Sequence, residues 1–291
     1  MASGRLATVQ RHLVAGRRDA QATAVSAPSS RSQPTTDEWA LRCDLAVAYR
    51  AAYLMGWHQE LFNHITVKIP NSDSLPHGPH FLINPFGLQF SEVTAGSLLR
   101  VGIDGTIIDK GTSTGILLGQ GFIVHSAIHA AREDMHCVVH CHHQPTVAVA
   151  MTKHGVLPMS QEIVGVYNNI SYHPFEGTAL DPAERGRMAK SLGPKNKILI
   201  LENHGPLTGG KTLAEAMFLM FRITRHCEYQ AQAMAAVGGD VSQLLVPTQE
   251  AVDEMAARDA PPIKYNPPKL QFESWRRRVE TKWGADNVYA P

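Results

Sequence analysis

Two histidines lie close together at the end of a strongly apolar stretch of the sequence. Residues 138–143 read Val-Val-His-Cys-His-His, so one residue separates His140 from His142. Side chains on a β-strand alternate between its two faces, so these imidazoles should point the same way, while Cys141 faces the core. Two adjacent neutral imidazoles supply half of a typical metal site. The spacing therefore predicts a metal-binding strand.

A third histidine lies at the end of another apolar stretch. Residues 198–201 read Ile-Leu-Ile-Leu, which is typical of a buried strand, and they lead shortly to His204 and a glycine. We therefore predict that His140, His142 and His204 bind one divalent ion, either zinc, manganese or iron(II), among which imidazole ligands do not discriminate. Alternatively, the three are ordinary core or surface histidines in a chain that contains 15 of them.

Other polar residues accompany these stretches. His125 and His129 are spaced i, i+4 on a predicted helix and share one face, but the glutamate of an HExxH motif is absent because serine follows His125. We predict that His125 is a polar neighbour of the metal site with a part in catalysis; a hydrogen-bonded helix histidine is the alternative. Asn63, His64 and Asn84 lie at predicted strand ends and could bind a substrate carboxylate through hydrogen bonds.

Composition limits the classes of function that the chain can have. It has 291 residues, of which 44% are hydrophobic and 18% charged, with a net charge of +1. This composition supports a full core, offers no basic surface for nucleic acid, and includes no apolar run as long as a membrane span. The four cysteines form no CxxC pair and no compact disulfide framework, which indicates a reducing, cytoplasmic location. We expect a small-molecule substrate, with no nucleic acid and no membrane as partner.

The N-terminal segment differs in composition from the rest. Residues 1–36 contain five arginines and a single acid, Asp19, which is typical of either a disordered arm or an organelle-targeting segment. The main domain is expected at residues 37–240, followed by an extension at 241–291 with a short amphipathic helix. Because the arm lacks periodic apolar positions, a chain that starts at Asp37 should keep its stability.

Strand and helix patterns alternate along the main domain. This order predicts the α/β class, with a mixed sheet covered by helices on both faces. The strand patterns fall at residues 63–69, 80–83, 99–102, 106–108, 138–142, 165–173, 198–204 and 206–210. The helix patterns fall at residues 38–55, 122–132, 144–151, 183–191 and 212–236.

Several of these stretches resemble the class II aldolase/adducin family, in particular its adducin-type subgroup. The resemblance implies a three-layer α/β/α sandwich around a mostly antiparallel sheet, commonly in a homotetramer with sites at subunit interfaces. It also implies one divalent metal on the paired and the later histidines, and a catalytic role for Glu162, which falls near an acid that some members donate across an interface. The stretches that carry the resemblance are residues 84–87, 91–94, 121–132, 138–142 and 199–205.

The sequence departs from the sugar-phosphate aldolases of this family at two places. Those enzymes carry a glutamate as catalytic base before the first metal histidine, but that position here falls at Gly121 or its neighbours, and residues 111–131 contain no acid. Phe86 and residues 119–120 (Gly-Gln) replace hydroxyl-bearing residues of the family's phosphate site. The resemblance, with these departures, implies a substrate without a phosphate group.

These features together predict a metal-dependent carbon–carbon lyase. Decarboxylation needs an electron sink and a later proton donor but no base to start it, so the missing glutamate favours a decarboxylase of an unphosphorylated carbonyl or hydroxy acid, which could be aromatic. Three alternatives follow from the resemblance: an iron(II)-dependent oxygenase of an arylpyruvate-type acid, a class II aldolase, and an adducin-like scaffold without catalytic activity. The absence of a long lysine-rich tail of the adducin kind favours an enzyme.

Overall fold

One eight-stranded sheet forms the centre of the molecule. The structure is a computed structural model that describes residues 34–177, 183–257 and 265–291. The strands are β1 (His64–Lys68), β2 (His80–Ile83), β3 (Leu99–Gly102), β4 (Ile107–Asp109), β5 (Cys137–His140), β6 (Ile170–His173), β7 (Ile198–Leu201) and β8 (Gly205–Gly210). Their order is β4-β3-β2-β1-β5-β8-β7-β6. Neighbouring strands are antiparallel except β6 and β7, which are parallel, so the predicted mixed and mostly antiparallel sheet is confirmed.

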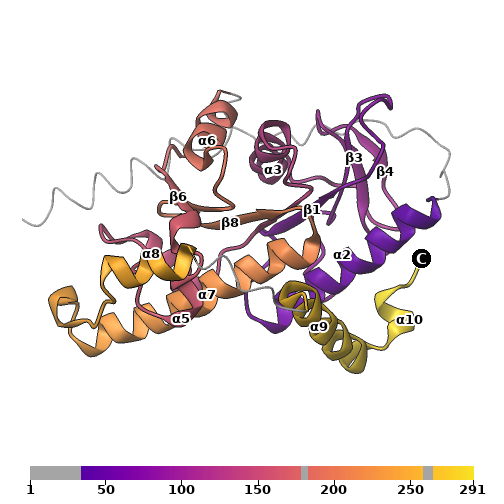
Figure 1. The fold of residues 1–291 in the computed structure, drawn as a ribbon. Coiled ribbons are helices and arrows are strands. Elements are labelled where there is room, and N and C mark those ends of the chain that lie inside the picture. The colour runs from indigo at the N-terminus through magenta and orange to yellow at the C-terminus, as the bar shows by residue number, and fades with distance from the viewer. Residues whose placement is uncertain (1–33, 178–182, 258–264) are drawn as a thin grey trace, which may run out of the picture.

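Helices cover both faces of this sheet (Figure 1). The helices α3 and α6 lie on one face, and α2, α7 and α9 lie on the other, which confirms the three-layer α/β/α arrangement. Among the described residues, no helix is long and apolar enough to cross a membrane. The helices are α2 (Thr36–Leu54), α3 (Gly119–Ala131), α4 (Gln144–Ala150), α5 (Gln161–Val164), α6 (Glu184–Leu192), α7 (Leu213–Ala236), α8 (Gln249–Ala257), α9 (Pro267–Trp283) and α10 (Ala285–Val288), with 3-10 turns at Tyr167–Asn169 and Val241–Gln243.

Strand β5 separates two parts of the core. Val139 and Cys141 belong to the larger cluster beneath α2 and α7, whereas Val138 packs on the opposite face in a cluster with residues of α3 and α6. The Cys141 thiol lies 3.4 Å from the Met220 sulfur, so it is the core residue that the sequence predicted. Because side chains alternate along a strand, His140 projects to the same face as Val138, towards α3 and α6.

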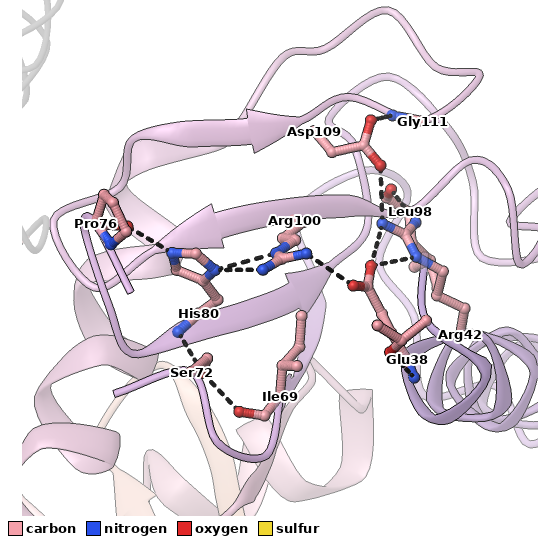
Figure 2. A network of polar contacts seen from close by, with 11 residues as sticks. Glu38, Arg42, Ile69, Ser72, Pro76, His80, Leu98, Arg100, Asp109 and Gly111 are labelled. Atoms are coloured by element: carbon pink, nitrogen blue, oxygen red, sulfur yellow. Dashed lines mark hydrogen bonds and ion pairs between the residues drawn. The ribbon is translucent and has the colours of Figure 1, made fainter. Parts of the chain in front are cut away.

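A buried network of charged groups joins the first turn of α2 to the edge of the sheet (Figure 2). The Glu38 carboxylate, only 2% exposed, accepts hydrogen bonds from Arg42 and Arg100, each at 2.9 Å. Arg42 also donates to the Leu98 carbonyl at 2.8 Å and pairs with Asp109 at 3.1 Å. Complete pairing offsets the cost of removing these charges from water, so the network fixes α2 against β3 and β4.

Helix α2 begins before the predicted position. Thr35 is its N-cap, and the Thr35 hydroxyl accepts a hydrogen bond from the Glu38 backbone N–H at 3.2 Å. The predicted domain start at Asp37 therefore falls inside the first helical turn, and a chain cut there would lose its cap. The remainder of the N-terminal arm, residues 1–33, lies outside the described residues.

The C-terminal extension packs against the main domain. Trp275 on α9 is 2% exposed and belongs to the same core cluster as Trp57, with the two rings 6.3 Å apart. The Arg276 guanidinium pairs with Asp44 on α2 at 2.6 Å. The predicted short amphipathic helix is in fact a helix of 17 residues that completes the layer around α2 and α7.

Candidate metal centre

The three predicted metal ligands converge at one edge of the sheet. His140 ends β5, His142 follows it, and His204 lies in the turn between β7 and β8. The Nε2 atoms of His140 and His142 are 3.1 Å apart, and one ring nitrogen from each of the three lies within 4.8 Å of the others. Gly205 permits this approach, because its φ is +156° and a Cβ there would lie 2.6 Å from the Cys141 carbonyl oxygen.

Hydrogen bonds on the far side of two rings determine which nitrogens face one another. His140 Nδ1 lies 3.0 Å from the Pro206 carbonyl oxygen, and His142 Nδ1 lies 2.7 Å from Gln59 Oε1. Both oxygens only accept, so each Nδ1 carries the proton and each Nε2 is left with a lone pair. Two acceptors 3.1 Å apart repel each other unless a cation lies between them. The donor set therefore fits a divalent metal ion, oriented from behind by Pro206 and Gln59.

The ligand histidines are electrically neutral at pH 7. Burial, together with a smaller effect of the neighbouring imidazoles, lowers the pKa of His142 to about 4 and that of His140 well below its ordinary value. Burial also lowers the pKa of His204. A neutral imidazole is the form that binds metal, so these ligands do not need to lose protons before binding near neutral pH.

Asn63 and Asn84 support the site from outside the cavity. The fully buried Asn63 accepts a hydrogen bond from the His142 backbone N–H at 2.7 Å and donates one to the Gln59 carbonyl at 2.9 Å. Asn84 Oδ1 lies 2.8 Å from the Tyr49 hydroxyl. The polar atoms of these two amides are committed to protein groups and neither residue lines the cavity, which favours a supporting role, and binding of a substrate carboxylate by them stays a prediction.

A cavity of about 270 Å³ opens beside the three histidines. Its wall includes His64, as predicted for a substrate-binding residue, and is otherwise largely apolar, with Phe62, Val124 and Met188. The Phe62 ring lies 6.0 Å from that of Phe86. Among the described residues that line the cavity, none is lysine or arginine. The cavity thus offers aromatic and apolar contacts but no fixed cation for a phosphate group.

The cavity lining also includes a second group of possible metal ligands that the sequence prediction missed, namely His173, Glu176 and Glu184. His173 Nε2 lies 3.9 Å from a carboxylate oxygen of Glu176 and 3.9 Å from one of Glu184. Arg187 also pairs with Glu176, at 2.6 Å. His173 ends β6 opposite Leu201 on parallel β7, so both strands lead to the edge where the metal ligands lie. This shared edge could have indicated that His173 lies near the metal ligands, but the parallel pairing of β6 and β7 could not be predicted from the sequence.

His125 and Glu162 lie away from the cavity wall. His125 is fully buried behind His64, with its Nε2 2.7 Å from His64 Nδ1, so it can act on a substrate only through His64. Glu162 lies on α5, predicted as a loop, where its backbone carbonyl accepts a hydrogen bond from Arg222 at 2.5 Å. Neither residue lines the cavity of this chain, so the catalytic roles of His125 and Glu162 stay predictions, which would need action through His64 for His125 and a neighbouring subunit for Glu162.

Comparison with known protein families agrees with this geometry. Residues 43–231 match the model of the class II aldolase and adducin N-terminal domain. The chain belongs to this family. A Caulobacter vibrioides protein described among the class 2 aldolases is 41% identical over 227 residues, which cover 78% of this chain and 84% of that protein. Rat alpha-adducin is 44% identical over 207 residues, covering 71% of this chain but only 27% of the adducin.

Solved structures show the same fold. An aldolase II superfamily protein from Pseudomonas syringae has a TM-score of 0.79 and 36% identity, and the match covers 88% of this chain and 97% of that one. An L-fuculose 1-phosphate aldolase from Glaciozyma antarctica has a TM-score of 0.74 and 24% identity, over 90% and 96% of the two chains. The second likeness supports the fold alone.

Proposed function

We propose that the chain is a divalent-metal-dependent carbon–carbon lyase, and within that class a decarboxylase of an unphosphorylated carbonyl or hydroxy acid. The observation that carries this proposal is a cavity with three neutral imidazoles on one wall and no lysine or arginine among its described lining residues. A divalent ion at His140, His142 and His204 would supply a Lewis acid that draws electrons from the bond that breaks.

The protein groups around the ligands have separate tasks. Pro206 and Gln59 hold the Nδ1 protons of His140 and His142, so that both Nε2 lone pairs stay directed to one point. Asn63 holds the backbone on which His142 lies. The apolar wall around Phe62 excludes water from a bound acid and strengthens the electrostatic interactions inside.

Charge on the cavity wall supports an unphosphorylated substrate. Glu184 lines the cavity and would repel a phosphate dianion, which finds no lysine or arginine among the described lining residues, whereas the charge of Glu176 is compensated by Arg187. The Phe86 ring does not line the cavity but lies 6.0 Å from the ring of Phe62, so an aromatic side chain takes the place of a hydroxyl donor behind the cavity wall. A carboxylate, in contrast, could be neutralised by an ion at the three histidines, and an aromatic body would fit against the phenyl rings.

The position that holds the catalytic base in the sugar-phosphate aldolases lacks an acid in this chain, which favours decarboxylation. Gly121 provides no carboxylate, and decarboxylation needs no proton abstraction to begin. The proton that replaces carbon dioxide requires a donor, for which we propose Glu162 of an adjacent copy in a tetramer. A Glu162→Gln chain should turn over more slowly with unchanged metal content and oligomer size, whereas unchanged turnover would leave Glu162 a structural role.

The metal assignment has a direct test. We expect about one divalent ion per purified chain, and a large loss of that ion in His140→Ala, because removing one of three ligands weakens metal binding by orders of magnitude. His136→Ala, in the turn before β5, is the matched control and should keep its metal. Equal metal content in the wild type and His140→Ala would refute the assignment.

The reaction class is tested with candidate acids. The metal-loaded protein is incubated with aromatic and 2-oxo acids, with and without oxygen, while carbon dioxide and oxygen are followed. Release of carbon dioxide in the absence of oxygen supports the decarboxylase. Cleavage to an aldehyde without release of carbon dioxide indicates an aldolase. Turnover only with iron(II) and oxygen identifies the oxygenase, which a three-histidine set also suits.

The similarity to alpha-adducin favours one non-enzymatic alternative. With 44% identity over the shared region, a scaffold role like that of an adducin head is the second candidate. No turnover of any acid, together with specific binding of a cytoskeletal protein, would favour this scaffold over the lyase.

A further inference from the structure

A chain of hydrogen bonds runs from the cavity into the core behind it. His64 Nδ1 lies 2.7 Å from His125 Nε2, and His125 Nδ1 lies 2.6 Å from the Thr66 hydroxyl. The same hydroxyl lies 2.8 Å from His129 Nε2, and His129 Nδ1 lies 2.8 Å from the Met135 carbonyl oxygen. All four side chains are at least nine-tenths buried, so these hydrogen bonds are largely shielded from bulk water.

The Met135 carbonyl sets the direction of every bond in this chain. A carbonyl oxygen only accepts, so His129 Nδ1 carries the proton and its Nε2 must accept from Thr66. The single Thr66 proton is then used, so its oxygen accepts from His125 Nδ1, and His125 Nε2 accepts from His64 Nδ1. Burial lowers the pKa of His129 to about 3, and none of the four hydrogen bonds involves a carboxylate that could compensate a positive charge, so the rings are neutral. His64 is left with an unprotonated Nε2.

The Nε2 atom of His64 occupies the space that a side chain at residue 121 would take. A Cβ built on Gly121 would lie 2.2 Å from His64 Nε2, and both residues line the cavity. His64 thus fills the position from which a side chain at residue 121 would enter the cavity. His64 belongs to neither of the two groups of possible metal ligands among the described residues, His140, His142 and His204 or His173, Glu176 and Glu184, so the Nε2 lone pair of His64 remains for another partner.

We propose that His64 Nε2 accepts a hydrogen bond from a hydroxyl group of the substrate and thereby selects a hydroxylated acid. An unprotonated nitrogen repels a carboxylate, so the predicted carboxylate-binding role of His64 is replaced by recognition of a donor. The inference deepens the proposed function, because it assumes that an acid is held at the three histidines. Its geometric basis, the fixed direction of the hydrogen-bond chain, can be tested without metal or substrate.

The first experiment measures the tautomer of His64 in the metal-free full chain. Nitrogen-15 NMR of ring-labelled histidine distinguishes Nδ1–H from Nε2–H, and the signal missing in His64→Gln identifies the residue. We expect the Nδ1–H tautomer. Thr66→Val should change the His64 signals because His125 loses its acceptor, whereas Thr208→Val, an equally buried threonine on β8, should not. An Nε2–H tautomer, or no response to Thr66→Val, would overturn the proposal.

The second experiment measures recognition of one hydroxyl group. Calorimetric titration of the zinc-loaded chain compares 4-hydroxy-2-oxobutanoate with 2-oxobutanoate, which share the 2-oxo acid group and differ by the hydroxyl. We expect roughly tenfold tighter binding of the hydroxylated acid, the size of one good hydrogen bond. The preference should disappear in His64→Phe, which keeps a ring but no acceptor, and persist in Gln120→Ala on the same wall.

The two experiments separate the inference from the function on which it rests. Loss of the preference in Gln120→Ala but not in His64→Phe would overturn the role of His64 while leaving an acid-binding metal site. Binding of neither acid would refute both the proposed acid substrate and hydroxyl selection by His64. The NMR result would then still report whether the hydrogen bonds run in the direction that the Met135 carbonyl imposes.

Discussion

Replacement of Asn63 by alanine should weaken both the fold and the metal centre, although Asn63 touches neither metal nor cavity. The change removes the 2.7 Å bond to the His142 N–H and the 2.9 Å bond to the Gln59 carbonyl, at a residue that is 0% exposed. Each hydrogen bond contributes about 1 kcal/mol net, and leaving the buried His142 N–H unpaired adds a further cost. We therefore expect the free energy of unfolding to fall by about 3 kcal/mol.

Metal affinity should fall with stability, because Asn63 fixes both the backbone of His142 and the segment that carries Gln59. Loss of such support typically lowers metal affinity by about 10- to 100-fold. Urea unfolding of the metal-free chain measures the first effect, and competition with a chelator measures the second. Gln120→Ala, an exposed residue on the cavity wall, is the control. A wild-type urea midpoint together with wild-type metal affinity in Asn63→Ala would refute this account of the site.

Three further predictions follow from the fold. A chain that starts at Asp37 should be less stable than one that starts at residue 34 by about 1 kcal/mol, because it lacks the Thr35 cap; equal urea midpoints would contradict this. Arg42→Met should lower the free energy of unfolding by about 3 kcal/mol, because it leaves the Glu38 carboxylate partly unpaired. In a double-mutant cycle, adding Glu38→Gln to this variant should restore part of the lost stability. Burial lowers the pKa of His129 to about 3, so below about pH 6.5 only the unfolded chain binds this proton. This one proton should therefore lower the free energy of unfolding of the metal-free chain by about 1.4 kcal/mol per pH unit on acidification, and the other buried histidines with lowered pKa values should add to the fall. A urea midpoint that does not change between neutral pH and about pH 5 would contradict this.

Local patterns in the sequence were sufficient to locate the metal ligands and most elements. The apolar run before His140 and the one before His204 each mark a strand, and strand ends are where side chains can meet. The histidine spacing itself was interpreted too simply, because β5 ends at His140 and His142 lies beyond it. The two rings converge because Asn63 and Gln59 hold the segment after the strand.

Long-range pairing could not be predicted from these patterns. The roles of Asn63 and Asn84 depend on the antiparallel pairing of β1 with β5 and on Tyr49 of α2, neither of which has a local signal. His173 lies near the metal ligands only because β6 pairs in parallel with β7. The absence of an acid at Gly121 was visible in the sequence, but the filling of that space by His64 required the packing of α3 against β1.

The packing of α9 on α2 affects how the chain can fold while it is being synthesised. Arg276 and Asp44 are 232 residues apart in sequence, and Arg50 and Asn287 are 237 apart. At ribosomal rates of about 5 to 20 residues per second, α2 emerges roughly 10 to 50 seconds before its covering helix exists. During that interval the surface around Trp57 lacks its contact with Trp275, so this part of the core can be completed only after nearly the whole chain has been made.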